Sequence, residues 1–252
     1  MNEQILKIKT AQGEMETFIV HPSDKGPFPV VILYMDVWGI REELLDIARK
    51  IAVVGYYCVL PDFYYRQGIV RNAFRNDKNE MISVDRLNPE QTKIVLTPLS
   101  KLTDDMVISD TSALINFIDR DFHAIKGAIG AIGYCMGGRH VMQVMGAFPD
   151  RFKACASLHG SLIVTDEMDS PHLSALKNTG ELYCGLAEKD RHAQPEKVKA
   201  LINTPWNLQF QYQLHLGAAH GYALPDRDVH DKKAANTDWE IIFKMFKRQL
   251  SH

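Results

Sequence analysis

The stretch Gly133-Tyr134-Cys135-Met136-Gly137 decides more about the fold of this chain than any other. It follows the apolar run 128–132 and precedes a helical pattern over 139–148. We therefore expect a strand, a sharp turn and a helix, with the cysteine at the apex of the turn. Glycines on both sides suit a turn in which a side chain would collide with the adjoining strand and helix. At a helix N-terminus, unpaired N–H groups and the helix dipole favour the thiolate form of Cys135.

The spacing G-x-C-x-G is that of the nucleophile elbow of α/β-hydrolases, with sulfur in place of the serine oxygen. The alternative is a structural cysteine between packing glycines, because free cysteine is often a small core residue. The other cysteines, Cys58, Cys155 and Cys184, lie in apolar, strand-like runs and are expected to be buried and inert. No spacing among the four fits a zinc site or a C-x-x-C motif.

Length and composition describe an ordinary globular protein. The chain has 252 residues, is 46% hydrophobic and carries a formal net charge of −2. The near-neutral charge argues against a nucleic-acid surface, and no segment reaches the roughly 20 apolar residues of a membrane span. Residues 1–7 lack the apolar core of a secretory signal, so we expect a cytoplasmic location. The oligomeric state stays open.

Strand and helix patterns alternate along the chain. Alternating residues predict an N-terminal β-hairpin within 1–27, and 63–100 is expected to be an irregular excursion. Apolar runs predict strands at 28–35, 56–60, 127–133, 152–158, 181–186 and 208–216. Helical patterns fall at 41–54, 106–119, 139–148, 196–202 and 237–249, the last with Thr237 as its cap. The alternation predicts one α/β domain over 1–252, with a mostly parallel central sheet and helices on both faces.

Candidate partners of Cys135 follow later strands, where ligands bind in such sheets. In α/β-hydrolases the chain order is nucleophile, acid, histidine. Asp190 follows one late strand, with Glu188 as a second carboxylate in the same turn, and His220 follows the last strand. Two other histidines, His159 and His215, lie after or within strands. Chain order favours His220 over both.

The loop after the first parallel strand supplies further candidates. Asp36 ends that strand, where an aspartate ordinarily caps a turn or a helix. An oxyanion hole in this fold takes one N–H from the residue after the nucleophile and one from this loop. Those groups are expected to be the N–H groups of Met136 and Val37.

Taken together, these residues resemble the dienelactone hydrolase family from about 28 to 250. The resemblance rests on Asp36-Val37-Trp38-Gly39, the elbow, the segment 185–190 and His220-Gly221-Tyr222. It implies an α/β-hydrolase fold and hydrolysis of a small-molecule carboxylic ester or lactone, as by a carboxymethylenebutenolidase. It also implies a triad of Cys135 as nucleophile, Asp190 as orienting acid and His220 as base, with no metal or cofactor. Substrate contacts are expected from Trp38, Tyr134, Tyr222 and Arg227.

Two departures from the family concern the substrate and the thiol. Asp36 stands where the founding enzymes carry a glutamate that helps the cysteine to ionise. Leu224 stands where the founding enzymes carry an arginine that binds a substrate carboxylate, and Arg227 lies three residues further on. A second substrate-binding arginine of the family belongs to the middle segment, where the candidates are Arg66, Arg71 and Arg75.

A different class of function is also compatible with the elbow. A non-hydrolytic protein of the same fold would use Cys135 as a redox-sensitive or ligand-binding thiol. Asp190 and His220 favour the hydrolase, because a sensor needs neither. The glycines at 127, 130 and 133 do not have the G-x-G-x-x-G spacing of a dinucleotide site.

Overall fold

The computed structural model describes residues 1–250, and within them eight strands form one sheet. The strands are β1 (Asn2–Thr10), β2 (Gly13–His21), β3 (Phe28–Tyr34), β4 (Tyr57–Pro61), β5 (Ala124–Tyr134), β6 (Phe152–Leu158), β7 (Glu181–Lys189) and β8 (Gln209–Ala219). Their order in the sheet is β1-β2-β4-β3-β5-β6-β7-β8. The first two pairs in this order are antiparallel and all later pairs are parallel. The predicted hairpin and mostly parallel sheet are confirmed.

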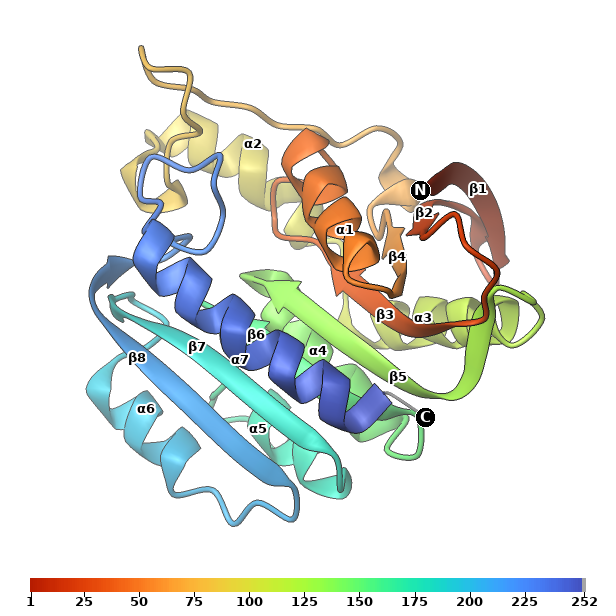
Figure 1. Ribbon diagram of the computed structural model, residues 1–252. Coiled ribbons are helices and arrows are strands. Elements are labelled where there is room, and N and C mark those ends of the chain that lie inside the picture. The colour runs from red at the N-terminus through yellow and green to blue at the C-terminus, as the bar shows by residue number, and fades with distance from the viewer. Residues whose placement is uncertain (251–252) are drawn as a thin grey trace.

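Helices cover both faces of this sheet, as predicted. They are α1 (Glu42–Val53), α2 (Pro89–Leu99), α3 (Asp104–Ile118), α4 (Met136–Ala147), α5 (Pro171–Ser174), α6 (Pro195–Ile202) and α7 (Lys232–Leu250). Three short 3₁₀ turns are η1 (Tyr65–Gln67), η2 (Val84–Arg86) and η3 (Ala175–Lys177). Figure 1 shows α1 and α7 in front of the sheet, with α3 and α4 behind it. None of the described helices combines the length and apolarity needed to cross a membrane.

Burial explains why these segments take these forms. The middle of β3 is a continuous apolar run with no exposed surface, as expected for a parallel strand covered on both faces. Helix α1 instead buries one stripe at helical spacing and leaves its other residues partly or fully exposed. The stripe consists of Leu44, Ile47, Ala48, Ile51 and Ala52. Each element therefore presents its apolar side to the same core.

Two helices depart from the sequence-based expectation. Helix α2 lies inside the segment expected to be irregular. Its start is a capping box, in which the Asn88 side chain accepts from the Gln91 N–H and the Gln91 side chain accepts from the Asn88 N–H. Helix α7 begins at Lys232 rather than at Thr237, because Asp231 accepts from the first free N–H groups. Thr237 lies within that helix, so the prediction that it caps the helix was wrong.

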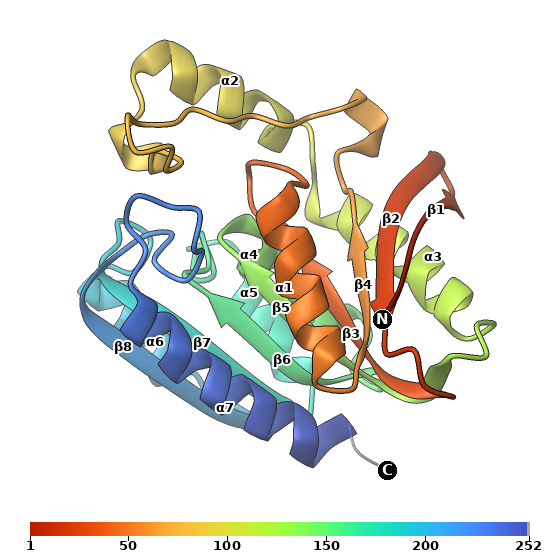
Figure 2. The ribbon, with the colours of Figure 1, turned by 45° about the horizontal axis from the view of Figure 1, so that its top comes forward.

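The elbow lies between β5 and α4, at the carboxyl end of the sheet. Helix α2 and the chain leading to it cross above this end (Figures 1 and 2). Part of the segment 63–100 therefore lies over the region in which the candidate site residues meet.

Candidate active site

Cys135 occupies the apex of the turn between β5 and α4. Its φ of 57° and ψ of −117° are strained for a residue with a side chain. A Cβ on Gly133 would lie 2.1 Å from the carbonyl oxygen of Gly137, and one on Gly137 would lie 2.3 Å from that of Tyr34. The flanking glycines are thus required by close backbone packing. Cys135 is a residue of intermediate exposure, whereas the other three cysteines are buried.

His220 and Asp190 meet beside the elbow. Nδ1 of His220 lies 2.7 Å from Oδ2 of Asp190, and both side chains are more than nine-tenths buried. The other carboxylate oxygen of Asp190 accepts from the N–H of His192 at 2.8 Å. Glu188 is exposed and accepts from the N–H of Gly217. The structure therefore brings Asp190, and not Glu188, to His220.

Electrostatics couple the imidazole to the thiol. Burial alone raises the pKa of Cys135, but the charge of His220 and hydrogen bonds from His220 and Ser161 lower that pKa below its ordinary value of 9.0. Burial likewise lowers the pKa of His220, but the Cys135 thiolate and Asp190 raise it from 6.5 to about 10. Both shifts favour a thiolate–imidazolium pair, in which the sulfur is already a nucleophile.

Ser161 is a member of this cluster that the sequence reasoning missed. Its Oγ lies 3.3 Å from Sγ of Cys135, and its N–H donates to the carbonyl oxygen of Cys135 at 3.0 Å. Ser161 lies in the loop after β6, and no motif distinguishes it from other loop serines. Only the neighbouring positions of β5 and β6 in the sheet bring it to the thiol.

The two residues expected to form an oxyanion hole lie next to each other. The hydroxyl of Tyr64 lies 3.3 Å from the carbonyl oxygen of Val37 and 3.3 Å from the sulfur of Met136. Met136 is the first residue of α4, where backbone N–H groups have no partner within the helix. The two residues therefore lie on the same side of the elbow, and the role of their N–H groups as a pair of donors stays a prediction.

Asp36 has arginines as partners rather than the thiol. Its carboxylate, which has no exposed surface, accepts from Arg41 at 2.8 Å and from Arg227. Burial raises the pKa of Asp36, but the two arginine charges outweigh burial and lower that pKa below 3.8. The Asp36 charge raises the pKa of Cys135. In this arrangement Asp36 therefore opposes ionisation of the thiol, unlike the role implied by the resemblance.

These groups surround a narrow pocket with a volume of about 10 Å³, roughly the space of one water molecule. Its lining residues are Asp36, Trp38, Ser83, Val84, Cys135, His159, His220, Gly221 and Arg227. The guanidinium of Arg227 lies 4.6 Å from the centroid of the Trp38 ring. Two predicted substrate contacts, Trp38 and Arg227, thus reach the pocket.

The other two predicted contacts do not line the pocket. Tyr134 is fully buried, and its hydroxyl has no hydrogen-bond partner. The hydroxyl of Tyr222 donates to Asp238 at 2.6 Å. None of the three middle arginines lines it either. Arg66 pairs with Asp110, Arg71 with Glu16, and Arg75 donates to the carbonyl oxygen of Asn79.

A short segment that we call the strap, residues 81–86, closes one side of the pocket. Met81 pairs with Arg227, and the N–H of Ser83 donates to the carboxylate of Asp228 at 3.0 Å. Arg86 forms an ion pair with the same carboxylate. Ser83 and Val84 line the pocket, although the sequence reasoning had no basis for selecting them within the polar excursion.

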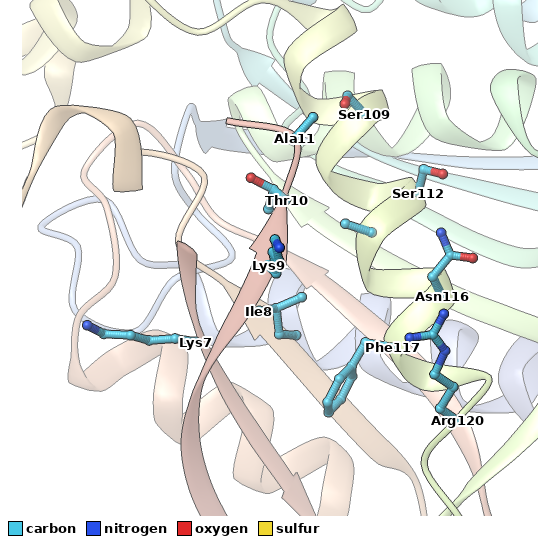
Figure 3. A pocket seen from close by; sticks show the side chains of 11 residues that line it. Lys7, Ile8, Lys9, Thr10, Ala11, Ser109, Ser112, Asn116, Phe117 and Arg120 are labelled. Atoms are coloured by element: carbon cyan, nitrogen blue, oxygen red, sulfur yellow. The ribbon is translucent and has the colours of Figure 1, made fainter. Parts of the chain in front are cut away.

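A larger groove lies elsewhere, between β1 and α3 (Figure 3). Its volume is about 570 Å³, and its charged lining residues are Lys7, Lys9 and Arg120. No cysteine, histidine or carboxylate lines it. The larger groove is therefore not the candidate active site. The small pocket is, because titratable side chains with shifted pKa values gather there.

A mostly parallel sheet with an elbow after β5 defines an α/β-hydrolase fold. A crystal structure of a provisionally named dienelactone hydrolase from Klebsiella pneumoniae matches with a TM-score of 0.79 at 20% identity, over 98% of each chain. A dienelactone hydrolase-like promiscuous phosphotriesterase from metagenomic libraries matches with a TM-score of 0.78 at 15% identity, over 99% of each chain. At such identities, these likenesses concern the fold.

The family follows from the sequence comparison. The model of the dienelactone hydrolase family matches residues 15–250, so the chain belongs to this family of hydrolases. A provisionally named carboxymethylenebutenolidase from Synechocystis sp. is 25% identical over 98% of this chain and 96% of its own length. One from Methylorubrum extorquens is 27% identical over 63% of this chain, and the match spans about half of that relative, 49%.

Proposed function

We propose that this protein hydrolyses carboxylic esters or lactones through a thioester formed on Cys135. The observation that carries the proposal is the position of His220. Its ring, held at 2.7 Å by Asp190, lowers the pKa of the Cys135 thiol at the apex of the elbow. An activated nucleophile, a base and an orienting acid are the requirements of covalent acyl transfer.

The first half of the reaction forms the acyl-enzyme. The Cys135 thiolate attacks the carbonyl carbon, and the N–H groups of Met136 and Val37 hydrogen-bond to the oxygen that gains the negative charge. Each such donor lowers the barrier by about 3 kcal/mol. The carbon–oxygen ester bond then breaks, and the His220 imidazolium gives its proton to the departing alkoxide.

The second half regenerates the enzyme. Neutral His220 takes a proton from water, whose oxygen attacks the thioester carbon. The carbon–sulfur bond breaks, the thiolate leaves and the carboxylic acid is released. Asp190 keeps the imidazole in the tautomer that both halves need.

Arg227 is the proposed contact for the substrate. It lines the pocket, and its guanidinium donates to Asp36. Because Asp36 already neutralises much of this charge, neutral esters should compete well with acidic lactones. A strong preference for a free carboxylate that is lost in Arg227→Ala would show instead that Arg227 grips an anionic substrate.

The test is hydrolysis of a short-chain nitrophenyl ester and of a dienelactone by the wild type and by Cys135→Ala. Cys58→Ala, which removes a buried thiol in β4, is the matched control. We expect turnover of at least one substrate by the wild type and the control, and loss of turnover in Cys135→Ala. An inert wild type whose Cys135 still reacts quickly with a thiol reagent would support the redox or ligand-binding alternative instead.

A further inference from the structure

His159 is a buried histidine in the pocket to which the proposed mechanism gives no task. It follows β6, is 1% exposed and lines the same pocket as Cys135 and His220. Its ring centroid lies 5.0 Å from that of His220 and 5.5 Å from that of Tyr222. The imidazole therefore stands directly beside the proposed base.

Both ring nitrogens of His159 lack a hydrogen-bond partner. Within residues 1–250, it is the one side chain with two such buried atoms. Other buried histidines are better satisfied: His215 lies 2.6 Å from Asp238, His172 lies 2.7 Å from Ser170, and in His140 only Nδ1 is a buried atom without a partner. Buried polar atoms without partners are rare and costly, and they call for an explanation.

The backbone holds the ring in this place. His159 has a φ of 37°, in the left-handed region that residues with side chains seldom adopt. Its N–H donates to the carbonyl oxygen of Gly185 at 2.8 Å, and the carbonyl oxygen of the preceding Leu158 accepts from Cys135 at 3.1 Å. The residue is thus fixed between β7 and the elbow.

The ring is also kept neutral. Burial and the charge of His220 hold the pKa of His159 well below 6.5. A neutral imidazole offers one N–H donor and one lone-pair acceptor at the same time. A hydroxyl group, which both donates and accepts, matches such a ring better than a methyl group.

We propose that His159 determines specificity by hydrogen bonding to an oxygen substituent that the substrate carries next to its scissile carbonyl. This inference rests on the proposed function of the same pocket and narrows its substrate class to oxygen-substituted esters or lactones. The shared pocket supports it, because His159 and Cys135 line the same narrow space, and the group next to the scissile carbonyl is the part of a substrate that comes nearest to the His159 ring.

Phenyl glycolate and phenyl propionate form a suitable probe pair, because they differ only by a hydroxyl in place of a methyl group. We would measure kcat/KM for both esters with the wild type, His159→Phe and His159→Gln. Phenylalanine keeps a planar ring without nitrogens, and glutamine keeps a donor and an acceptor. Dividing the two values within each variant, and then comparing variants, cancels the intrinsic reactivity of the esters.

We expect His159→Phe to lower the glycolate-to-propionate ratio by roughly tenfold, the effect of one net hydrogen bond. His159→Gln should restore part of the ratio. An unchanged ratio, or equal losses on both esters together with a lowered Tm, would overturn the inference and leave His159 a packing residue. If the wild type hydrolyses a nitrophenyl ester or a dienelactone but neither phenyl ester, the inference about His159 fails alone. If it hydrolyses none of these substrates, the proposed function fails and the role of His159 fails with it.

Discussion

At the scale of single residues, the reactivity of the Cys135 thiol depends on a few neighbouring side chains. His220, Asp190 and Ser161 each make one short contact that sets the charge or orientation of the next group. Chain order was enough to select His220 and the turn that holds Asp190, whereas the choice of Asp190 over Glu188 came from the family resemblance. Ser161 could not be selected in this way, because its role depends on a contact between neighbouring strands that sequence spacing does not encode.

Replacing Asp190 with asparagine should strongly lower kcat. The amide would leave the His220 ring in the wrong tautomer, and such a loss costs roughly 10⁴-fold in hydrolases that use a triad. Glu188→Gln is the matched control, because Glu188 lies in the same segment but contacts the backbone of Gly217. Steady-state ester hydrolysis measures both. Equal kcat values for the two variants would contradict the assignment of the acid.

Replacing Ser161 with alanine should raise the pKa of the Cys135 thiol. The Ser161 hydroxyl lowers this pKa by hydrogen bonding, so its loss moves the pKa back toward 9.0. The measurement is the alkylation rate of Cys135 by iodoacetamide against pH, whose midpoint should move upward. Ser157→Ala is the control, because the hydroxyl of Ser157 has no partner. Equal midpoints in both variants would show that Ser161 does not stabilise the thiolate.

At the scale of elements, the sequence predicted helices and strands best where buried residues recur at a regular spacing. The parallel strands and α1 have continuous or striped apolar patterns, and the structure confirmed them. Helix α2 was missed because it is only weakly amphipathic and contains Pro98, although Asn88 and Gln91 signal its start. The start of α7 was misplaced because Thr237 has the residue type of a helix cap, although the buried Ala234 and Ala235 precede it in the same helix. The strap has no period at all, so its place over the pocket could not be predicted.

The strap should limit the size of the acyl group that the pocket accepts. Val84 lines a pocket far smaller than the roughly 300 Å³ of an ordinary ligand site. Val84→Ala should therefore raise kcat/KM for a nitrophenyl hexanoate relative to the acetate. Val53→Ala, at an exposed position of α1, is the control. If both variants keep the wild-type ratio of the two esters, the strap does not set the size limit.

At the scale of the whole molecule, Asp36 joins distant parts of the chain. Its carboxylate pairs with Arg41 just before α1 and with Arg227 in the loop before α7, and Arg41 also pairs with Asp226 at 2.5 Å. These charges are buried together at the carboxyl end of the sheet. The residues around Asp36 favoured a turn or helix cap, and the family resemblance implied a helper of the thiol, but sequence distance hid its connection to Arg227.

Asp36→Asn should lower the free energy of unfolding by about 3–5 kcal/mol, because it leaves the buried Arg41 and Arg227 with Asp226 as their one remaining carboxylate partner. Asp46→Asn, in an exposed pair with Arg49, should cost only about 0–1 kcal/mol. Urea unfolding followed by circular dichroism measures both. Folding lowers the pKa of Asp36, so its contribution is present above pH 3.8 and is lost as the pH falls through the lowered pKa. Similar losses at pH 7 in both variants would contradict a structural role for Asp36.

The central claim is that Cys135 carries the acyl group. The most direct measurement is rapid acid quenching of the enzyme during turnover of a nitrophenyl ester, followed by peptide mass analysis. We predict one acyl group on the peptide that contains Cys135, held in a bond that hydroxylamine cleaves. We also predict that His220→Ala accumulates the acylated form once the pH is high enough to ionise the thiol without His220, because water is then not activated. Sustained turnover with no acyl group on Cys135 would contradict the account.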